Sequence, residues 1–218
     1  MASVRLLPDN RSVPVNTIFC IGRNYAKHAA ELGNPTEKTP VVFLKPVSAL
    51  IGEDHAIELP SFSNTIHHEA ELVVLLGRGG KNIPREDAPG CVRGYGIGLD
   101  LTARDTQDTL KAKGLPWTIA KGFDTSACLS AFVPKEALPD PRTLRFTLDV
   151  NGERRQTGDT SMMLFPVDVL IAYLSTVFTL SEGDLIFTGT PEGVAPIARG
   201  DVLSLHLMDT VSAQFLVR

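Results

Sequence analysis

Cysteines, long apolar runs and basic clusters are all scarce in this sequence, and each absence excludes a class of protein. The three cysteines, Cys20, Cys91 and Cys128, are odd in number and widely spaced, which argues against a disulfide framework and against a Cys-x-x-Cys metal site. No apolar run is long enough to cross a bilayer, and the first residues lack the apolar core of a signal peptide. We therefore expect a cytoplasmic protein that does not bind membranes, because a reducing compartment keeps thiols free.

An excess of charge of one sign is missing as well. The 218 residues include 21 Lys and Arg and 25 Asp and Glu, a net charge of -4, and no stretch is rich in Lys or Arg. This balance argues against binding to nucleic acid. The hydrophobic content of 43% is ordinary for a globular protein. We expect one domain over residues 1–218, in which residues 1–15 could form a small N-terminal extension.

Short apolar segments that end in Gly, Pro or Asn dominate the chain and predict a mainly β protein. Asn151-Gly152 lies between the segments 146–150 and 154–156, which predicts a tight hairpin because both turn positions require positive φ. The other strands are expected at residues 17–21, 41–44, 56–59, 67–76, 94–99, 184–188 and 201–207.

A few stretches have the periodicity and end signals of helices. Thr102 is a candidate N-cap for a helix over about 103–113, which Gly114 can end. A second helix begins near Pro166, where apolar residues repeat on one face. A third covers about 25–32. The fold class expected from these patterns is mainly β with a few helices, that is, α+β.

Two glutamates, Glu69 and Glu71, stand one residue apart within the predicted buried strand 67–76. Side chains at positions i and i+2 of a strand point to the same face, so two carboxylates would lie side by side. Because burying like charges without a partner is very unfavourable, a cation must lie between them. Oxygen ligands favour Mg2+, Mn2+ or Ca2+ over zinc. The alternative is that both glutamates face water on an edge strand, with Ala70 and Leu72 turned inward.

Asp100 supplies a third carboxylate. It closes the apolar segment 94–99 immediately before the predicted helix, and a rigid strand end is a common place for a ligand-binding side chain. Taken alone, Asp100 could serve only to stabilise the helix, through the interaction of its carboxylate with the positive N-terminal end of the helix dipole. Together with Glu69 and Glu71 it is sufficient for a Mg2+ or Mn2+ site that leaves positions for water and substrate.

The chain contains five sequence motifs in the order and spacing of a known protein family. They are His67-x-Glu69-x-Glu71-Leu72, Asp100-Leu101-Thr102-Ala103-Arg104-Asp105-x-Gln107, Gly114-Leu115-Pro116-Trp117-x-x-Ala120-Lys121, Val150-Asn151-Gly152-Glu153 and Thr188-Gly189-Thr190-Pro191-x-Gly193-Val194. Together they resemble the fumarylacetoacetate hydrolase family over nearly the whole chain. The resemblance is greatest to the small single-domain branch, which is similar to acylpyruvases and oxaloacetate decarboxylases.

The resemblance implies a mixed β-roll fold of the type of the fumarylacetoacetate hydrolase C-terminal domain. It also implies that Glu69, Glu71 and Asp100 hold a divalent ion, Mg2+ or Mn2+, for which Ca2+ can substitute in crystals. Family substrates carry a 2-oxo acid group, whose carboxylate and ketone oxygens can chelate one ion. A bound ion then acts as a Lewis acid towards the enolate that forms when a carbon–carbon bond breaks.

The resemblance also indicates residues that act on the substrate. Lys121 resembles the family lysine that points into the pocket, where an ammonium would stabilise a developing oxyanion; the plain alternative is a solvated lysine. His28 and Glu31 are three apart on the predicted helix and resemble a catalytic dyad in which the imidazole activates water. The alternative is an exposed His–Glu pair on a helix surface. The polar segment from about Tyr25 to Thr39 has the composition of a lid.

Other residues are candidates for substrate binding. Arg104 and Gln107 lie on one side of the predicted helix and could bind the distal oxygens of the substrate. Thr190, in a Gly-Thr-Pro turn, matches a family residue that binds the substrate carboxylate, and Lys45 could line the pocket. Each has a structural alternative: a helix salt bridge, a turn-forming hydroxyl or a surface charge. His67 precedes the glutamates at strand spacing, and we expect it to support a ligand rather than to ligate.

The leading interpretation is a metal-dependent hydrolase that cleaves the C3–C4 bond of an acylpyruvate-type 2,4-dioxo acid, such as an acylpyruvate or fumarylpyruvate. One alternative is oxaloacetate decarboxylation, which needs the same enolate but no attacking water. Another is isomerisation or decarboxylation of 2-hydroxyhepta-2,4-dienedioate-type diacids in aromatic catabolism. An alternative of another class is a non-catalytic, metal-dependent binder of oxo acids. By family analogy we expect a homodimer.

Overall fold

Strands form most of the regular structure of this protein, as the sequence predicts. The structure, a computed structural model, describes residues 2–31 and 38–218. The strands are β1 (Ser3–Leu6), β2 (Arg11–Pro14), β3 (Ile18–Gly22), β4 (Val41–Lys45), β5 (Leu50–Ile51), β6 (Ile66–His68), β7 (Ala70–Leu76), β8 (Val92–Asp100), β9 (Thr102–Ala103), β10 (Ala127–Leu129), β11 (Val133–Pro134), β12 (Arg145–Val150), β13 (Glu153–Asp159), β14 (Leu185–Phe187), β15 (Ala195–Pro196), β16 (Val202–Leu207) and β17 (Val211–Leu216). The helices are α1 (Ala26–Glu31), α2 (Arg104–Ala112), α3 (Thr118–Lys121) and α4 (Val167–Val177), with 3-10 turns at Val47–Ala49, Arg85–Cys91, Lys135–Ala137 and Thr160–Met162.

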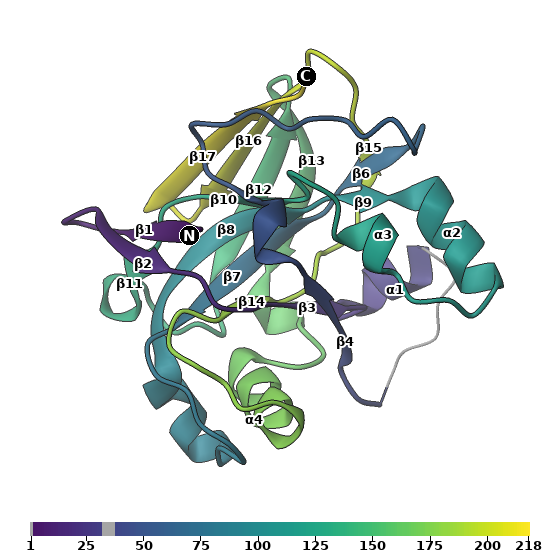
Figure 1. Cartoon of the computed structure of the whole chain (residues 1–218). Coiled ribbons are helices and arrows are strands. Elements are labelled where there is room, and N and C mark those ends of the chain that lie inside the picture. Colours follow the sequence, from purple (N-terminus) through teal and green to yellow (C-terminus); the bar gives the residue numbers. More distant parts are fainter. Residues whose placement is uncertain (1, 32–37) are drawn as a thin grey trace.

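The strands β7 and β8 lie at the centre of the largest sheet (Figure 1), whose order is β4-β3-β14-β7-β8-β10-β5, with β11 beside β8. Every residue of β7 is buried. Leu72 packs in one apolar cluster and Val73 in another, so the strand is covered on both faces. A continuous apolar run is the sequence expected for a strand covered in this way. Glu71, in the same strand, is therefore an interior carboxylate.

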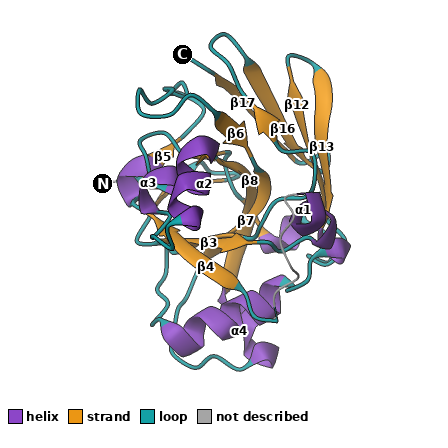
Figure 2. Cartoon of the chain, turned by 90° about the vertical axis from the view of Figure 1, so that its right-hand side faces the viewer, coloured by secondary structure: helices purple, strands orange, loops and turns teal. Residues whose placement is uncertain are grey.

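A second sheet, in the order β13-β12-β16-β17, lies at one end of the molecule, with α4 at the other end and α1 to α3 between them (Figure 2). The hairpin between β12 and β13 turns at Asn151 and Gly152, whose φ angles are 54° and 80°. The predicted tight turn is therefore confirmed. Two shorter sheets, β1-β2 and β15-β6-β9, complete the architecture, and the predicted mainly β fold with a few helices is confirmed.

The three predicted helices are present as α1, α2 and α4, but the cap of α2 differs and the short helix α3 was not predicted. The apolar stripe of α4 is buried, including Leu170 and Leu174. The helix α2 begins at Arg104, with Ala103 at the N-cap position and no side-chain cap. Thr102 is not the cap, because it belongs to β9 and its hydroxyl donates to Asp100 O at 3.2 Å.

The strands differ from the sequence prediction in several segments. The prediction did not include β1, β2, β5, β9, β10, β11, β15 or β17. The strand expected at residues 56–59 is wrong: within this segment only Ile57 forms a bridge, to Val217, and Glu58 N–H donates to a side chain, Thr125 Oγ1. The hairpin of β1 and β2 was not predicted. Its apolar side chains, among them Val4, join the same cluster as Val73 of the central strand.

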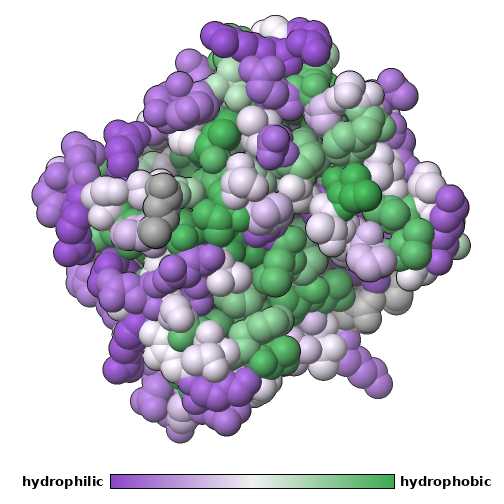
Figure 3. Space-filling view, in the orientation of Figure 1, coloured by the Kyte–Doolittle hydropathy of each residue, from purple (hydrophilic) through white to green (hydrophobic). Residues whose placement is uncertain are grey.

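On the face shown in Figure 3, hydrophilic residues dominate the rim and apolar residues reach the surface near the centre. In the parts of the chain that the structure describes, no helix combines the length and the apolar character that a membrane crossing requires.

Candidate metal centre

The centre of the site is the point where two antiparallel ribbons meet. The pairing of β6 with β9 reaches His67, and the pairing of β7 with β8 begins at Ala70. Glu69 stands in the gap between the two ribbons, where its carbonyl accepts a hydrogen bond from Asp100 N–H at 2.9 Å. This junction places Glu69, in the gap between the ribbons, next to Asp100, the last residue of β8.

Glu69, Glu71 and Asp100, which we call the carboxylate cluster, converge in the interior. One carboxylate oxygen of each lies within 4.8 Å of those of the other two. Their residues are 5%, 1% and 1% exposed. The alternative in which the two glutamates face water on an edge strand is therefore wrong.

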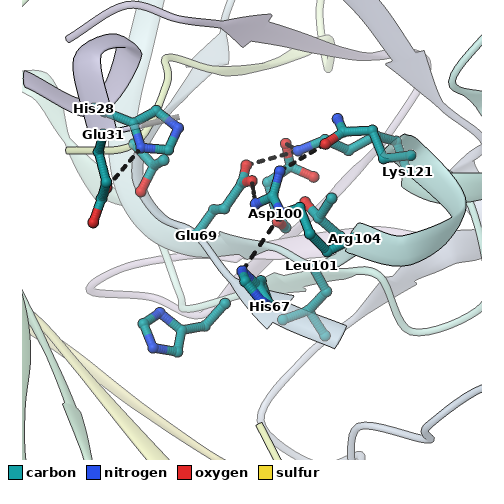
Figure 4. Close-up of polar contacts among 12 residues, drawn as sticks. His28, Glu31, His67, Glu69, Asp100, Leu101, Arg104 and Lys121 are labelled. Atoms are coloured by element: carbon teal, nitrogen blue, oxygen red, sulfur yellow. Dashed lines mark hydrogen bonds and ion pairs between the residues drawn. The ribbon is translucent and has the colours of Figure 1, made fainter. Parts of the chain in front are cut away.

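Cations contact two members of the carboxylate cluster (Figure 4). Lys121 Nζ lies 2.7 Å from Glu69 Oε2 and 2.7 Å from Asp100 Oδ2. Arg104 NH2 lies 2.6 Å from Glu69 Oε1. Burial alone would raise the pKa of Glu69, but the charges of Lys121 and Arg104 outweigh it and lower the pKa. Glu69 is therefore an anion at neutral pH.

Glu71 has a different environment. Its Oε2 accepts a hydrogen bond from Gly189 N–H at 2.7 Å. Burial, followed by the charges of Asp100 and Glu69, raises the pKa of Glu71 well above its usual value. A divalent cation among the three carboxylates would relieve this repulsion, and carboxylate oxygens are the ligands that hard ions prefer. The donor set therefore fits Mg2+ or Mn2+.

Lys121 comes from the short helix α3 and is buried, with a side chain 4% exposed. Burial would lower the pKa of its ammonium, but Asp100 and Glu69 raise it above the usual value. The group therefore remains a cation beside the carboxylate cluster. The alternative of a solvated surface lysine is wrong, because the side chain is enclosed.

Contrary to the prediction, Lys45 is not among the residues that line the cavity beside the carboxylate cluster. Its Nζ lies 2.8 Å from Asp100 Oδ1 in an ion pair, and its side chain is 0% exposed. The same ammonium donates to Leu101 O at 3.2 Å and to Ser126 Oγ at 3.1 Å. It also donates to Lys121 O. These contacts engage the ammonium of Lys45, so it supports Asp100 and the end of α3.

The predicted pair on α1 is present. His28 Nδ1 lies 3.4 Å from Glu31 Oε2 (Figure 4), and His28 is only 5% exposed, so it does not lie on a helix surface. Burial lowers the pKa of the His28 imidazole. The charges of Glu69 and Glu31 raise this pKa and the charge of Arg104 lowers it, but burial has the largest effect, so the pKa is lowered overall. A neutral imidazole can accept a proton. The lid expected from about Tyr25 to Thr39 includes residues 32–37, which lie outside the described residues.

Arg104 and Gln107 are joined to each other on α2. Arg104 NH1 donates to Gln107 Oε1 at 2.6 Å, and Arg104 Nε donates to His67 Nδ1 at 3.4 Å. His67 thus orients a residue that contacts Glu69, which is the supporting role expected for it. Both Arg104 and Gln107 line the cavity beside the carboxylate cluster.

Thr190 also lines this cavity, but its hydroxyl is used elsewhere. Thr190 Oγ1 donates to Ala70 O at 2.9 Å and accepts from Gln156 Nε2 at 2.9 Å. The hydroxyl hydrogen is therefore directed at the backbone and not at a substrate carboxylate. Gln156 itself was not predicted as a site residue. It lies 86 positions from Ala70 in the sequence, and no local motif marks the contact.

The cavity beside the carboxylate cluster is small, about 30 Å³. Larger hollows of about 540 Å³ and 670 Å³ lie elsewhere on the surface, but neither contains the carboxylate cluster. The chemistry of the lining, and not its size, identifies the site. The predicted site residues that line this cavity are His28, Glu69, Glu71, Arg104, Gln107, Lys121 and Thr190.

Comparison with known proteins identifies the family. The family model described as fumarylacetoacetate (FAA) hydrolase C-terminal matches residues 17–216. The chain belongs to the fumarylacetoacetate hydrolase family. The predicted resemblance is therefore confirmed, and with it the expectation of an enzyme family.

Relatives within the family are named for different activities. The oxaloacetate tautomerase FAHD1, mitochondrial, of Mus musculus is 49% identical over 92% of this chain and 91% of its own. The oxaloacetate decarboxylase, mitochondrial, of Dictyostelium discoideum is 46% identical over 85% and 86%. The crystal structure of fumarylpyruvate hydrolase from Pseudomonas aeruginosa in complex with Mn2+ and pyruvate has a TM-score of 0.92 and 37% identity, over 100% of this chain and 96% of that chain. The fold is thus that of the family's C-terminal domain.

Proposed function

We propose that this protein is a divalent-metal-dependent enzyme that stabilises the enolate of a short 2-oxo dicarboxylic acid, with oxaloacetate as the lead substrate. The observation that carries the proposal is the Lys121 ammonium, buried and 2.7 Å from both Glu69 and Asp100, in the cavity that His28 also lines. Carboxylates that hold an ion, a fixed cation and a neutral base are the groups that enolate formation requires.

The carboxylate cluster would hold Mg2+ or Mn2+, and a bound ion supplies a Lewis acid for the oxygens of the 2-oxo acid. Lys121 adds a second positive charge close to the oxygen on which negative charge develops. His28 accepts a proton from C3 of the keto acid, and Glu31 orients the imidazole. Return of a proton to the enolate oxygen gives the enol, and return to carbon gives the keto form.

The charges around the cavity favour a substrate with two carboxylates. Arg104 and Lys111 both line the cavity. Burial, and then the charge of Arg104, lowers the pKa of Lys111. Cations that repel one another in a partly buried cavity are stabilised by an anionic ligand. Oxaloacetate brings a second carboxylate to this wall, whereas the uncharged acyl group of acetylpyruvate does not.

The similarity to proteins named oxaloacetate tautomerase and oxaloacetate decarboxylase, at 49% and 46% identity, supports the same choice. It favours the oxaloacetate alternative over acylpyruvate hydrolysis, the leading interpretation from the sequence. Decarboxylation gives the enolate of pyruvate and tautomerisation gives the enolate of oxaloacetate. Both place the negative charge on the C2 oxygen, because departure of C4 as CO2 leaves on C3 the electron pair that loss of a C3 proton also leaves.

A substrate panel tests the proposal. Oxaloacetate, acetylpyruvate and fumarylpyruvate are supplied separately to the protein loaded with Mg2+ or with Mn2+. Ultraviolet absorbance follows enol–keto conversion, and coupled reduction of pyruvate follows carbon–carbon cleavage. We expect acceleration of both oxaloacetate reactions, with either ion. A protein that hydrolyses acylpyruvates but accelerates neither oxaloacetate reaction contradicts the proposal.

Hydrolysis of an acylpyruvate is the second candidate function, and the His28–Glu31 contact favours it. A buried neutral imidazole, oriented by a carboxylate at 3.4 Å, is suited to activate a water molecule for attack on a C4 carbonyl. The same panel decides between the two reactions. The homodimer expected from the family stays a prediction, which light scattering of the purified protein tests.

A further inference from the structure

The side chain of Gln156 reaches from β13, in the second sheet, to the strand that carries the glutamates. It is 1% exposed. Its Oε1 accepts hydrogen bonds from Ala70 N–H and from His68 Nδ1, both at 3.0 Å. Its Nε2 donates to Thr190 Oγ1 at 2.9 Å and to Pro191 O at 3.0 Å. This orientation of the amide is fixed, because a backbone N–H only donates and a backbone carbonyl only accepts.

Gln156 and two threonines take the place of a strand along one edge of β7. The neighbouring strand β14 ends before it reaches Ala70. Beyond that end, Thr188 Oγ1 donates to Leu72 O at 2.8 Å. Thr190 Oγ1 donates to Ala70 O at 2.9 Å, and Ala70 N–H donates to Gln156. Leu72 O also accepts from Thr188 N–H at 3.1 Å, whereas the N–H and carbonyl of Ala70 have side-chain partners on this edge. Side chains therefore satisfy the backbone groups of Ala70 that β14 does not reach.

The position of Ala70 connects this network to the candidate metal centre. Ala70 separates Glu69 from Glu71, so its backbone determines how the two carboxylates are held relative to each other. Gln156 holds the N–H of Ala70, and Thr190, itself held by Gln156, holds the carbonyl. Both polar groups of the residue between the glutamates thus depend on one amide.

We propose that Gln156 is a positioning residue for the candidate metal centre. By fixing the backbone between Glu69 and Glu71, it sets the affinity of the carboxylate cluster for a divalent ion. This inference rests on the proposed function, in which the carboxylate cluster holds the ion. Groups that orient metal ligands contribute strongly to metal affinity although they do not touch the ion.

Three variants separate this role from a general contribution to folding. Gln156→Glu retains the size and the acceptor oxygen but cannot donate to Thr190 or to Pro191 O. Gln156→Met retains the length and removes all four hydrogen bonds. Gln214 is exposed on β17, in the same sheet as Gln156, so Gln214→Glu makes the same chemical change away from the site and is the matched control.

The experiment is a calorimetric titration of each metal-free protein with Mn2+, with electron paramagnetic resonance of bound Mn2+ as a second readout. We expect both Gln156 variants to bind Mn2+ about 10- to 100-fold more weakly than the unmodified protein, with an altered spectrum. Gln214→Glu should bind as tightly as the unmodified protein. Thermal unfolding of the metal-free proteins identifies a temperature at which every variant is folded, and the titrations are made there.

A second pair of variants keeps the test decisive if the Gln156 variants do not fold. Thr190→Val removes the hydroxyl that links Gln156 to Ala70 O, and Thr190→Ser retains it. We expect weaker Mn2+ binding in Thr190→Val and near-normal binding in Thr190→Ser. Unchanged affinity in folded Gln156→Met or in Thr190→Val overturns the positioning role and leaves the proposed function intact. An unmodified protein that binds no Mn2+ overturns the proposed function itself.

Discussion

The Lys121 ammonium lies 2.7 Å from Asp100 Oδ2 and ties the end of α3 to the last residue of β8. The same nitrogen lies 2.7 Å from Glu69 Oε2, so one cation joins the carboxylate at the end of β8 to the carboxylate between β6 and β7. Both partners are almost fully enclosed, so solvent and salt screen their attraction less than that of a surface ion pair. The cation is thus placed where it can act on the charge of a bound substrate as well as on the carboxylate cluster.

Replacing Lys121 by methionine, which has a similar length, should lower kcat for oxaloacetate by about 10²- to 10³-fold. The reason is that the enolate loses a fixed positive charge in an enclosed site. Mn2+ affinity should not fall, because the substitution removes a cation that competes for the carboxylates. Steady-state kinetics at saturating Mn2+ measure the effect. Lys113→Met, a change at an exposed lysine, is the control, and equal losses in both variants would refute the assigned role.

Replacing His28 by alanine should separate the reactions that need a base from the one that does not. We expect tautomerisation of oxaloacetate and any acylpyruvate hydrolysis to fall by about 10²- to 10⁴-fold. Decarboxylation should fall less, because loss of CO2 requires no proton acceptor. The measurement is the ratio of tautomerisation to decarboxylation, in the unmodified protein and in His28→Ala. His206→Ala, at an exposed histidine of β16, is the control, and an equal loss of all activities in His28→Ala would speak against a base.

The activity that depends on His28 should begin to fall, on the acid side of its pH profile, only below the usual pKa of histidine, which is about 6.5. Burial, opposed by the charges of Glu69 and Glu31 and assisted by Arg104, lowers the pKa of the His28 imidazole. The reaction needs the neutral form, so it is at full rate above this pKa and falls about tenfold per pH unit below it. A pH profile of kcat/KM measures the limb. A limb above pH 7 would contradict the neutral imidazole.

Replacing Gly189 by alanine should both destabilise the protein and weaken Mn2+ binding. Gly189 has φ +100°, and an added Cβ would lie 2.6 Å from Asn24 Cβ, while its N–H donates to Glu71. Gly200, with φ +90° and open space around it, gives a matched control. Gly200→Ala carries only backbone strain, worth about 1–3 kcal/mol. The Tm, measured by calorimetry, should fall further in Gly189→Ala than in Gly200→Ala. Titration with Mn2+ should show weaker binding in Gly189→Ala and normal binding in Gly200→Ala.

Local rules account for the parts of the fold that the sequence predicted correctly. The turn at Asn151 and Gly152 requires positive φ at both residues, and few other sequences provide it. The segment Ala70–Leu76, which forms β7, is apolar except for Glu71, because both faces of this strand are covered. The segment 56–59 was wrongly predicted as a strand because a short apolar run does not show how far pairing with a neighbour extends, and here only Ile57 forms a bridge, to Val217. Thr102 fails as a cap because pairing with β6 draws it into a strand.

The candidate site was predictable to the extent that its residues are close in sequence or lie on regular elements. Glu69 and Glu71 follow from strand spacing, and Asp100 from its place at a strand end. Gln156 could not be found in this way, because its partners come from a different sheet and a distant turn. Lys45 was misplaced for a similar reason: only the fold brings its ammonium to Asp100.

The most direct test of the account is Mn2+ binding by the unmodified protein and by Glu71→Gln, measured by calorimetry on metal-free samples. Glutamine keeps the size of Glu71 but removes the charge that burial and the neighbouring carboxylates disfavour. We expect one Mn2+ per chain in the unmodified protein. In Glu71→Gln, we expect affinity lower by more than about 100-fold, with no loss of thermal stability in the metal-free state. Exposed Glu153→Gln should bind normally. Undiminished Mn2+ binding by Glu71→Gln would contradict the claim that Glu69, Glu71 and Asp100 form the metal centre.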